Sequence, residues 1–213
     1  MSIIIPTILT DSPAQFKQDL SNFLTLSKRI QVDFMDGDFV VAKSIDPTDI
    51  RINPVDLKII LEAHLMVEDP LEWLNRLPIN FSFAYLHFEV RNLKDMWPQW
   101  VESALMKGVR LGLAINPETP VDVIKNLTPV PEALLIMGVN PGRSGQTMLE
   151  GTFLKISRAR DIFLGPIGVD GGVNDQNINA VIASGADFIY IGSSISQAAD
   201  FSDQWQKLNA LLH

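Results

Sequence analysis

Eight short apolar segments recur along the chain, and stretches with helical spacing separate most of them. The apolar segments are residues 3–5, 30–34, 59–66, 84–88, 109–115, 133–137, 167–169 and 188–191. Short apolar runs that alternate with helices are typical of buried parallel strands, because the connecting helices cover the faces of the sheet. The pattern predicts an α/β fold, a single (β/α)₈ TIM barrel over residues 1–213, with an open doubly wound sheet as the alternative.

The helices of this barrel are expected between the apolar segments. Pro70 can occupy the first position of one helix, and Gly108 can close another. The spacing of apolar residues predicts helices from about residue 14 and over 97–107, 149–163, 176–183 and 202–212, and an irregular helix over 50–58.

Composition narrows the class of protein. The 213 residues carry a formal net charge of −8 with no cluster of basic residues, so neither nucleic acid nor an anionic membrane is expected as a partner. There is no cysteine, which excludes disulfides and thiolate metal sites. The N-terminus has no basic region before its apolar residues, and no apolar segment is long enough to cross a bilayer. We therefore expect a soluble, unprocessed, cytoplasmic protein.

Two of the predicted strands end in an aspartate. Asp33 lies at the end of the second strand and Asp170 at the end of the seventh. All strands of a parallel barrel open on one face, so the two carboxylates should face each other across one pocket. Such a pair could remove a proton from one side of a carbon and return it to the other. Alternatively, either aspartate could cap the next helix or pair with a basic residue.

Three glycine-rich loops follow the sixth, seventh and eighth strands. They contain the pairs Gly171-Gly172 and Gly192-Ser193, and the run Gly142-Arg143-Ser144-Gly145-Gln146. Barrels commonly bind phosphate at this place through backbone N–H groups. The loops therefore predict a phosphate site that needs no lysine.

One histidine and three methionines also lie at or near strand ends. His64 could bind a metal together with Asp33 and Asp170, since mixed nitrogen and oxygen ligands suit Zn²⁺, Mn²⁺ or Fe²⁺. Alternatively, it is a core imidazole hydrogen-bonded to the backbone. The methionines could form a water-poor wall beside a reactive intermediate, or could only fill the core; they are Met35, Met66 and Met137.

In order and spacing, these motifs cover nearly the whole chain and resemble the ribulose-phosphate 3-epimerase family. The residues that carry the resemblance are Pro6–Leu9, Val32–Val40, His64–Val67, His87–Glu89, Asn116–Pro120, Val139–Gly142 with Gly145-Gln146, Val169–Val173, and Gly185–Asp187 with Gly192-Ser193.

The resemblance implies a fold, a reaction and a site. The fold is a barrel of the ribulose-phosphate-binding type. The reaction interconverts D-ribulose 5-phosphate and D-xylulose 5-phosphate through an enediolate, with Asp33 and Asp170 as the acid/base pair. A divalent metal, zinc, manganese, iron or cobalt, stabilises the intermediate. Thr7 touches the substrate, the three glycine-rich loops hold its phosphate, and the protein assembles as a dimer or hexamer.

Three departures from the family pattern bear on these implications. Gln31 replaces a histidine that is one of four metal ligands in the family, and an amide oxygen binds zinc-like ions more weakly than imidazole does, so metal binding is weakened or lost. Residues 41–43 differ from the family's Pro-Asn. Arg143 places a guanidinium near the phosphate site, where it either binds phosphate or blocks the pocket. Two alternatives stay open: an epimerase of another ketose phosphate, such as a hexulose 6-phosphate, and a non-catalytic barrel that binds sugar phosphates.

Overall fold

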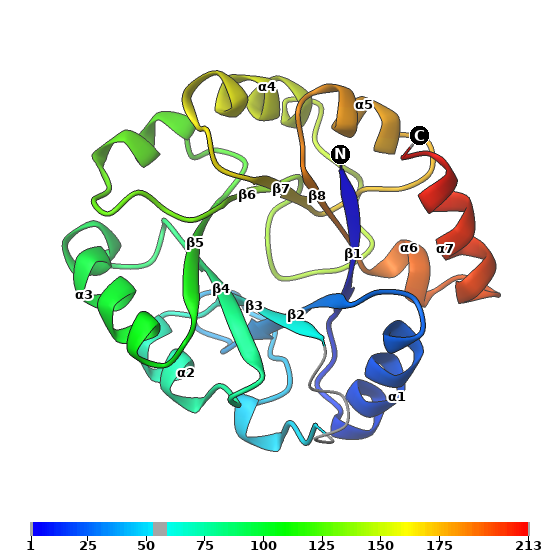
Figure 1. The fold of residues 1–213 in the computed structure, drawn as a ribbon, viewed down its shortest axis with the longest axis horizontal. Helices are drawn as coiled ribbons and strands as arrows, with labels where there is room; N and C mark the ends of the chain where they lie inside the picture. The colour runs from blue at the N-terminus through cyan, green and yellow to red at the C-terminus, as the bar shows by residue number, and fades with distance from the viewer. Residues whose placement is uncertain (1, 53–58, 213) are drawn as a thin grey trace.

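The computed structural model describes residues 2–52 and 59–212 of the chain. Within them, eight parallel strands form a closed barrel in which each strand pairs with the next and the eighth pairs with the first (Figure 1). The predicted (β/α)₈ barrel is confirmed, and the open sheet is wrong. The strands are β1 (Ile3–Ile8), β2 (Arg29–Met35), β3 (Ile60–Met66), β4 (Phe81–His87), β5 (Arg110–Ile115), β6 (Leu134–Met137), β7 (Ile167–Asp170) and β8 (Phe188–Ile191).

Helices surround the barrel as an outer ring (Figure 1). They are α1 (Pro13–Leu24), α2 (Pro70–Arg76), α3 (Leu93–Met106), α4 (Thr152–Ile162), α5 (Ile178–Ala183), α6 (Ser193–Ser196) and α7 (Phe201–Ala210), with the 3₁₀ helices η1 (Pro47–Asp49) and η3 (Val121–Asn126). In the described part of the chain, no helix combines the length and apolar character needed to span a membrane.

The expected elements differ from the observed ones mainly at their ends. The irregular helix predicted over 50–58 is not seen in its first residues, because the 3₁₀ helix η1 ends at Asp49; residues 53–58 of that prediction lie outside the described residues. Helix α3 begins at Leu93, four residues before the predicted start, and carries Pro98 inside it. A 3₁₀ helix, η3, follows β5 where a full helix stands in most other repeats.

Side chains of each strand alternate between two separate cores. Those that point outward pack against the helices and include Val32, Phe34 and Leu65. Those that point inward fill the barrel and include Tyr85, Leu135 and Tyr190. Both sets are almost completely withdrawn from solvent, so burial of apolar area on both faces of the sheet stabilises the closed barrel.

A polar cluster lies within the barrel among these inward-facing residues. The Glu62 carboxylate is completely buried and pairs with the Arg29 guanidinium, which also lies 4.2 Å from the centre of the Phe188 ring. The Tyr190 hydroxyl donates a 2.6 Å hydrogen bond to Glu62 and lies 3.0 Å from the Tyr85 hydroxyl. A buried carboxylate is costly unless it is paired and hydrogen-bonded, and here it has both kinds of partner.

Substitution of Arg29 by methionine should therefore destabilise the barrel strongly. The variant leaves the Glu62 charge buried without its cation, and we expect a loss of about 3 kcal/mol in the free energy of unfolding. Chemical denaturation followed by circular dichroism measures this loss.

Arg110→Met is the matched control for Arg29→Met. Arg110 also begins a strand and lies over an aromatic ring, 5.7 Å from the centre of Phe83, but its partner Glu132 is exposed and 3.5 Å away. Because exposed ion pairs contribute little, this variant should lose less than about 1 kcal/mol. Equal losses in the two variants would contradict the role given to the buried pair.

Candidate functional site

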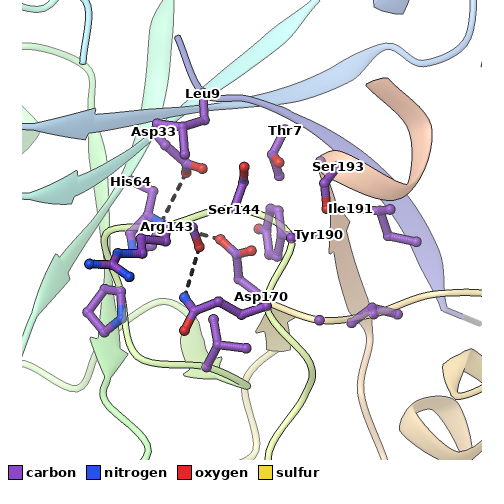
Figure 2. Close-up of a pocket in the computed structure, with 18 of the residues that line it drawn as sticks. Thr7, Leu9, Asp33, His64, Arg143, Ser144, Asp170, Tyr190, Ile191 and Ser193 are labelled. Carbon is purple, nitrogen blue, oxygen red and sulfur yellow. Dashed lines mark hydrogen bonds and ion pairs between the residues drawn. The ribbon is translucent and has the colours of Figure 1, made fainter. Parts of the chain in front are cut away.

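A pocket opens at the carboxyl ends of the barrel strands (Figure 2). Asp33, His64 and Asp170 project into it from β2, β3 and β7, and Thr7 and Ser193 lie on the side opposite to His64 and Arg143. The pocket is also lined by the glycine-rich loops that follow β6, β7 and β8. The closed parallel barrel therefore brings together most of the residues that the sequence singled out.

The two carboxylates converge on the same pair of donors. The Gln31 amide nitrogen donates to Asp33 Oδ1 over 3.0 Å and to Asp170 Oδ2 over 2.9 Å. His64 Nδ1 lies 3.1 Å from Asp33 Oδ1 and 3.3 Å from Asp170 Oδ2. Asp33 and His64 are direct neighbours in the register of β2 and β3, which places their inward side chains side by side. The two carboxylates are therefore close enough for one small ligand to contact both of them at once.

Burial and charge shift the proton affinities of this group. Burial, together with the charge of Asp170, raises the pKa of Asp33 above its ordinary value. Burial alone would lower the pKa of His64, but its hydrogen bonds to Asp170 and Asp33 outweigh this and raise it to about 9. The site therefore attracts positive charge, either as a proton on His64 or as a bound cation.

The same residues fit a divalent metal ion. One ligand atom each from Asp33, His64 and Asp170 lie within 4.8 Å of one another, and the set of two oxygens and one nitrogen suits zinc, manganese or iron. The Gln31 Oε1 atom is buried without a hydrogen-bond partner. Rotation of this amide would exchange its oxygen and nitrogen, so Gln31 can offer a neutral fourth ligand but leaves one polar atom unpaired in either orientation.

The predicted methionine wall is only partly seen around the pocket. Met66 and Met137 line it, whereas Met35 is buried at the end of β2 and is not one of its lining residues. The Met35 backbone N–H instead bonds the Ser44 hydroxyl over 2.9 Å. The substrate-binding role of these methionines stays a prediction.

Close packing explains two of the glycines in the loops. Gly172 has a φ of +73°, and a Cβ atom there would lie 2.4 Å from the backbone nitrogen of Met148. A Cβ atom at Gly192 would lie 2.5 Å from Thr7 Oγ1. The loops after β7 and β8 thus approach their neighbours closely at these two glycines, both of which line the pocket.

The two basic residues near the mouth take different positions. Arg143 is exposed and lines the pocket, on the His64 side in Figure 2. The backbone of Lys43 forms an isolated antiparallel β-bridge with that of Asp36, and the Lys43 side chain packs over Gly37. Lys43 is not one of the residues that line the pocket.

Sequence reasoning missed one residue of the site and misplaced another. Tyr190 lines the pocket and connects it to the buried Glu62. His87 ends β4, and strand ends were expected at the mouth, but this side chain is completely buried behind His64, with Glu89 beyond it. Burial lowers the pKa of His87, and hydrogen bonds from His87 and Thr119 lower that of Glu89 although burial opposes them. The sequence signal for this arrangement was the pair His87 and Glu89, which stand two residues apart at the end of one strand.

Comparisons with known proteins agree with this geometry. The model of the ribulose-phosphate 3 epimerase family matches residues 3–196. The chain is 31% identical over 204 residues to the cytoplasmic isoform of ribulose-phosphate 3-epimerase from Oryza sativa subsp. japonica, covering 92% of this chain and 88% of the relative. It is 30% identical to ribulose-phosphate 3-epimerase from Bacillus subtilis (strain 168), covering 80% and 81%.

Solved structures share the fold. The chain resembles 3-hexulose-6-phosphate synthase from Salmonella typhimurium with a TM-score of 0.71, 11% identity and coverage of 100% and 98% of the two chains. It resembles phosphoribosyl anthranilate isomerase from Thermus thermophilus with a TM-score of 0.66, 19% identity and coverage of 100% and 98%. At these identities the likeness shows the barrel alone.

Replacement of Gln31 by histidine should strengthen metal binding at the three-residue cluster. An imidazole is a better ligand for zinc-like ions than an amide, and we expect the dissociation constant for Zn²⁺ to fall by roughly tenfold, or about 1.4 kcal/mol. Isothermal titration calorimetry of metal-free protein measures the constant. Gln31→Leu is the control that fills a similar volume without a ligand atom and should bind no more tightly than the original chain. If Gln31→His shows no gain, residue 31 does not face the metal.

Proposed function

Because the chain belongs to the ribulose-phosphate 3-epimerase family, its reaction is the interconversion of D-ribulose 5-phosphate and D-xylulose 5-phosphate, and we propose that Asp33 and Asp170 are its two bases. The observation that carries this assignment is their convergence: both carboxylates lie within 3.0 Å of one amide nitrogen, although they come from β2 and β7. A substrate carbon placed between them is within reach of both.

The two carboxylates divide the proton transfer between them. One removes the proton from carbon 3, next to the ketone, and the other returns a proton to the opposite face of the resulting enediolate. In the reverse direction they exchange roles. Burial and the charge of Asp170 raise the pKa of Asp33, a shift in the direction that a proton donor needs.

Asp33, His64, Asp170 and Gln31 would hold the divalent ion that the family implies. When bound, such an ion stabilises negative charge on the enediolate oxygens. We propose zinc, manganese, iron or cobalt, because the donor set contains one imidazole and two carboxylates. Gln31 contributes a weaker ligand than the other three.

The remaining pocket residues orient the sugar phosphate and exclude water. We place the phosphate against the backbone N–H groups of the three glycine-rich loops, and Thr7, Met66 and Met137 against the sugar. The contact of Gly192 with Thr7 supports a shared role for these residues. The binding set in the loops comprises Gly142, Arg143, Ser144, Gly145, Gly171, Gly172, Gly192 and Ser193.

Two further properties belong to the proposal and follow from the family rather than from the fold. We propose that the protein is a homo-oligomer, a dimer or hexamer. We also propose a cytoplasmic location, which one relative's description as a cytoplasmic isoform supports.

Asp33→Asn and Asp170→Asn should each abolish epimerisation while leaving phosphate binding nearly intact. Loss of one base removes proton transfer on one face, so the rate should fall by roughly 10³-fold or more. A coupled assay for xylulose 5-phosphate measures turnover. Binding of inorganic phosphate is measured by inhibition for the original chain and by direct titration for the variants.

Asp36→Asn is the control for these two variants. Asp36 lies three residues after Asp33 but does not line the pocket. Its Oδ1 accepts the N–H groups of Asp38 and Phe39, a role that an amide oxygen can keep, whereas the bond from the Glu68 N–H to Oδ2 would be lost at a cost in stability. This variant should retain a rate close to that of the original chain. Normal turnover in either Asp33→Asn or Asp170→Asn would refute the two-base assignment.

Gly172→Ala should raise KM for ribulose 5-phosphate by roughly tenfold with a smaller change in kcat. The added methyl group would strike the Met148 backbone and displace the loop that presents N–H groups to the phosphate. Gly151→Ala, where a Cβ meets nothing within 4 Å, is the control and should behave like the original chain. Steady-state kinetics measures both constants. An unchanged KM in Gly172→Ala would contradict phosphate binding by the loop after β7.

A further inference from the structure

A hydrogen-bonded chain of buried side chains lies behind His64, away from the pocket. His64 Nε2 is 2.8 Å from His87 Nε2, and the two rings are stacked with their centres 5.0 Å apart. His87 Nδ1 lies 3.3 Å from Glu89 Oε2. The other carboxylate oxygen of Glu89 accepts the Asn116 N–H over 2.9 Å and the Thr119 hydroxyl. These contacts run from His64 at the pocket through the end of β4 to the loop that follows β5.

The partners of Glu89 fix where the hydrogen atoms of this chain lie. Glu89 Oε1 faces two donors, so the carboxylate acts as an acceptor and His87 Nδ1 must donate to Oε2. A neutral imidazole has one donor and one acceptor nitrogen, which leaves His87 Nε2 as the acceptor. The hydrogen between the two histidines therefore belongs to His64 Nε2. His64 Nδ1 is left facing Asp33 and Asp170.

We infer that His87 and Glu89 are positioning residues that hold His64 with a hydrogen on Nε2, so that Nδ1 is the atom offered to the metal. This inference rests on the proposed function. With its hydrogen held on Nε2 by His87, His64 would present Nδ1 beside Asp33 and Asp170, where a divalent ion would bind. Imidazole ligands are generally oriented by an acceptor on their second nitrogen, and loss of that acceptor weakens metal binding.

A purely structural role for His87 makes a different prediction. Its ring also packs 4.9 Å from the centre of the Phe39 ring, and an apolar side chain of similar size could fill that space. If His87 only fills space, then its replacement by leucine should leave metal affinity unchanged. If it orients His64, an apolar residue should fail and a hydrogen-bond acceptor should partly succeed.

Nitrogen-15 NMR of the imidazole rings tests the hydrogen positions directly on the unmodified chain. The chain has only three histidines, so His87→Gln and His213→Gln suffice to assign the signals. With Zn²⁺ bound, we expect His64 to be protonated at Nε2 and metal-bound at Nδ1, and His87 to be protonated at Nδ1. A hydrogen on His87 Nε2, or His64 bound through Nε2, would overturn the inference.

The same spectrum of metal-free protein separates this inference from the proposed function. Neither substrate nor turnover is needed, so the hydrogen on His64 Nε2 can be found even if the chain proves inactive. Conversely, an active chain with His87 protonated at Nε2 would keep the proposed function and refute the positioning role.

Zinc titration of variants supplies the second readout. His87→Leu should raise the dissociation constant by roughly 10- to 100-fold, and His87→Gln should raise it less, because its side-chain oxygen can accept the His64 hydrogen. Leu86→Val is the matched control: Leu86 adjoins His87 on β4 but belongs to the outward-facing core, so the variant should lose stability and keep its zinc affinity. Equal affinities in all the variants, or an equal loss in Leu86→Val, would refute the inference.

Discussion

The electrostatic repulsion between two neighbouring carboxylates, one buried and one half-buried, governs this site. Asp33 and Asp170 would repel each other strongly with little water around them, so they persist together only because donors stand between them. The Gln31 amide and the His64 imidazole supply these donors at distances of 2.9 to 3.3 Å. A group that can exchange protons and attract a cation follows directly from this arrangement.

The barrel interior below the site contains another buried carboxylate, Glu62, whose charge is neutralised in a different way. Glu62 lies two residues before His64 on β3, so both side chains point inward at successive levels. Glu62 is fully paired with Arg29 and Tyr190, whereas the carboxylates above it are only partly compensated. The lower level is thus saturated and stabilises the barrel, and the upper level keeps the capacity to bind a ligand.

Gln31 changes the balance of charge at the upper level compared with the family pattern, which has histidine there. A histidine can carry a positive charge or present a basic lone pair, but an amide stays neutral and is a poor base. In this chain the amide cross-links the two acids through its nitrogen, and its oxygen remains buried without a partner. The remaining imidazole, His64, therefore has the larger share in neutralising the acids and, under the proposed function, would have the larger share in binding metal, which gives its orientation by His87 more weight.

The sequence by itself determined the eight-stranded barrel, because alternation of apolar strands with helices is a local property that each segment displays independently. It also placed Asp33, His64 and Asp170 at one mouth, since strand ends in a parallel barrel share a face. It did not reveal that Gln31 touches both acids, that His87 is buried behind His64, or that Tyr190 joins the pocket to Glu62. Apart from the contact of Gln31 with Asp33, these contacts join residues 23 to 139 positions apart, and they depend on strand register and side-chain direction, which only the closed tertiary structure decides.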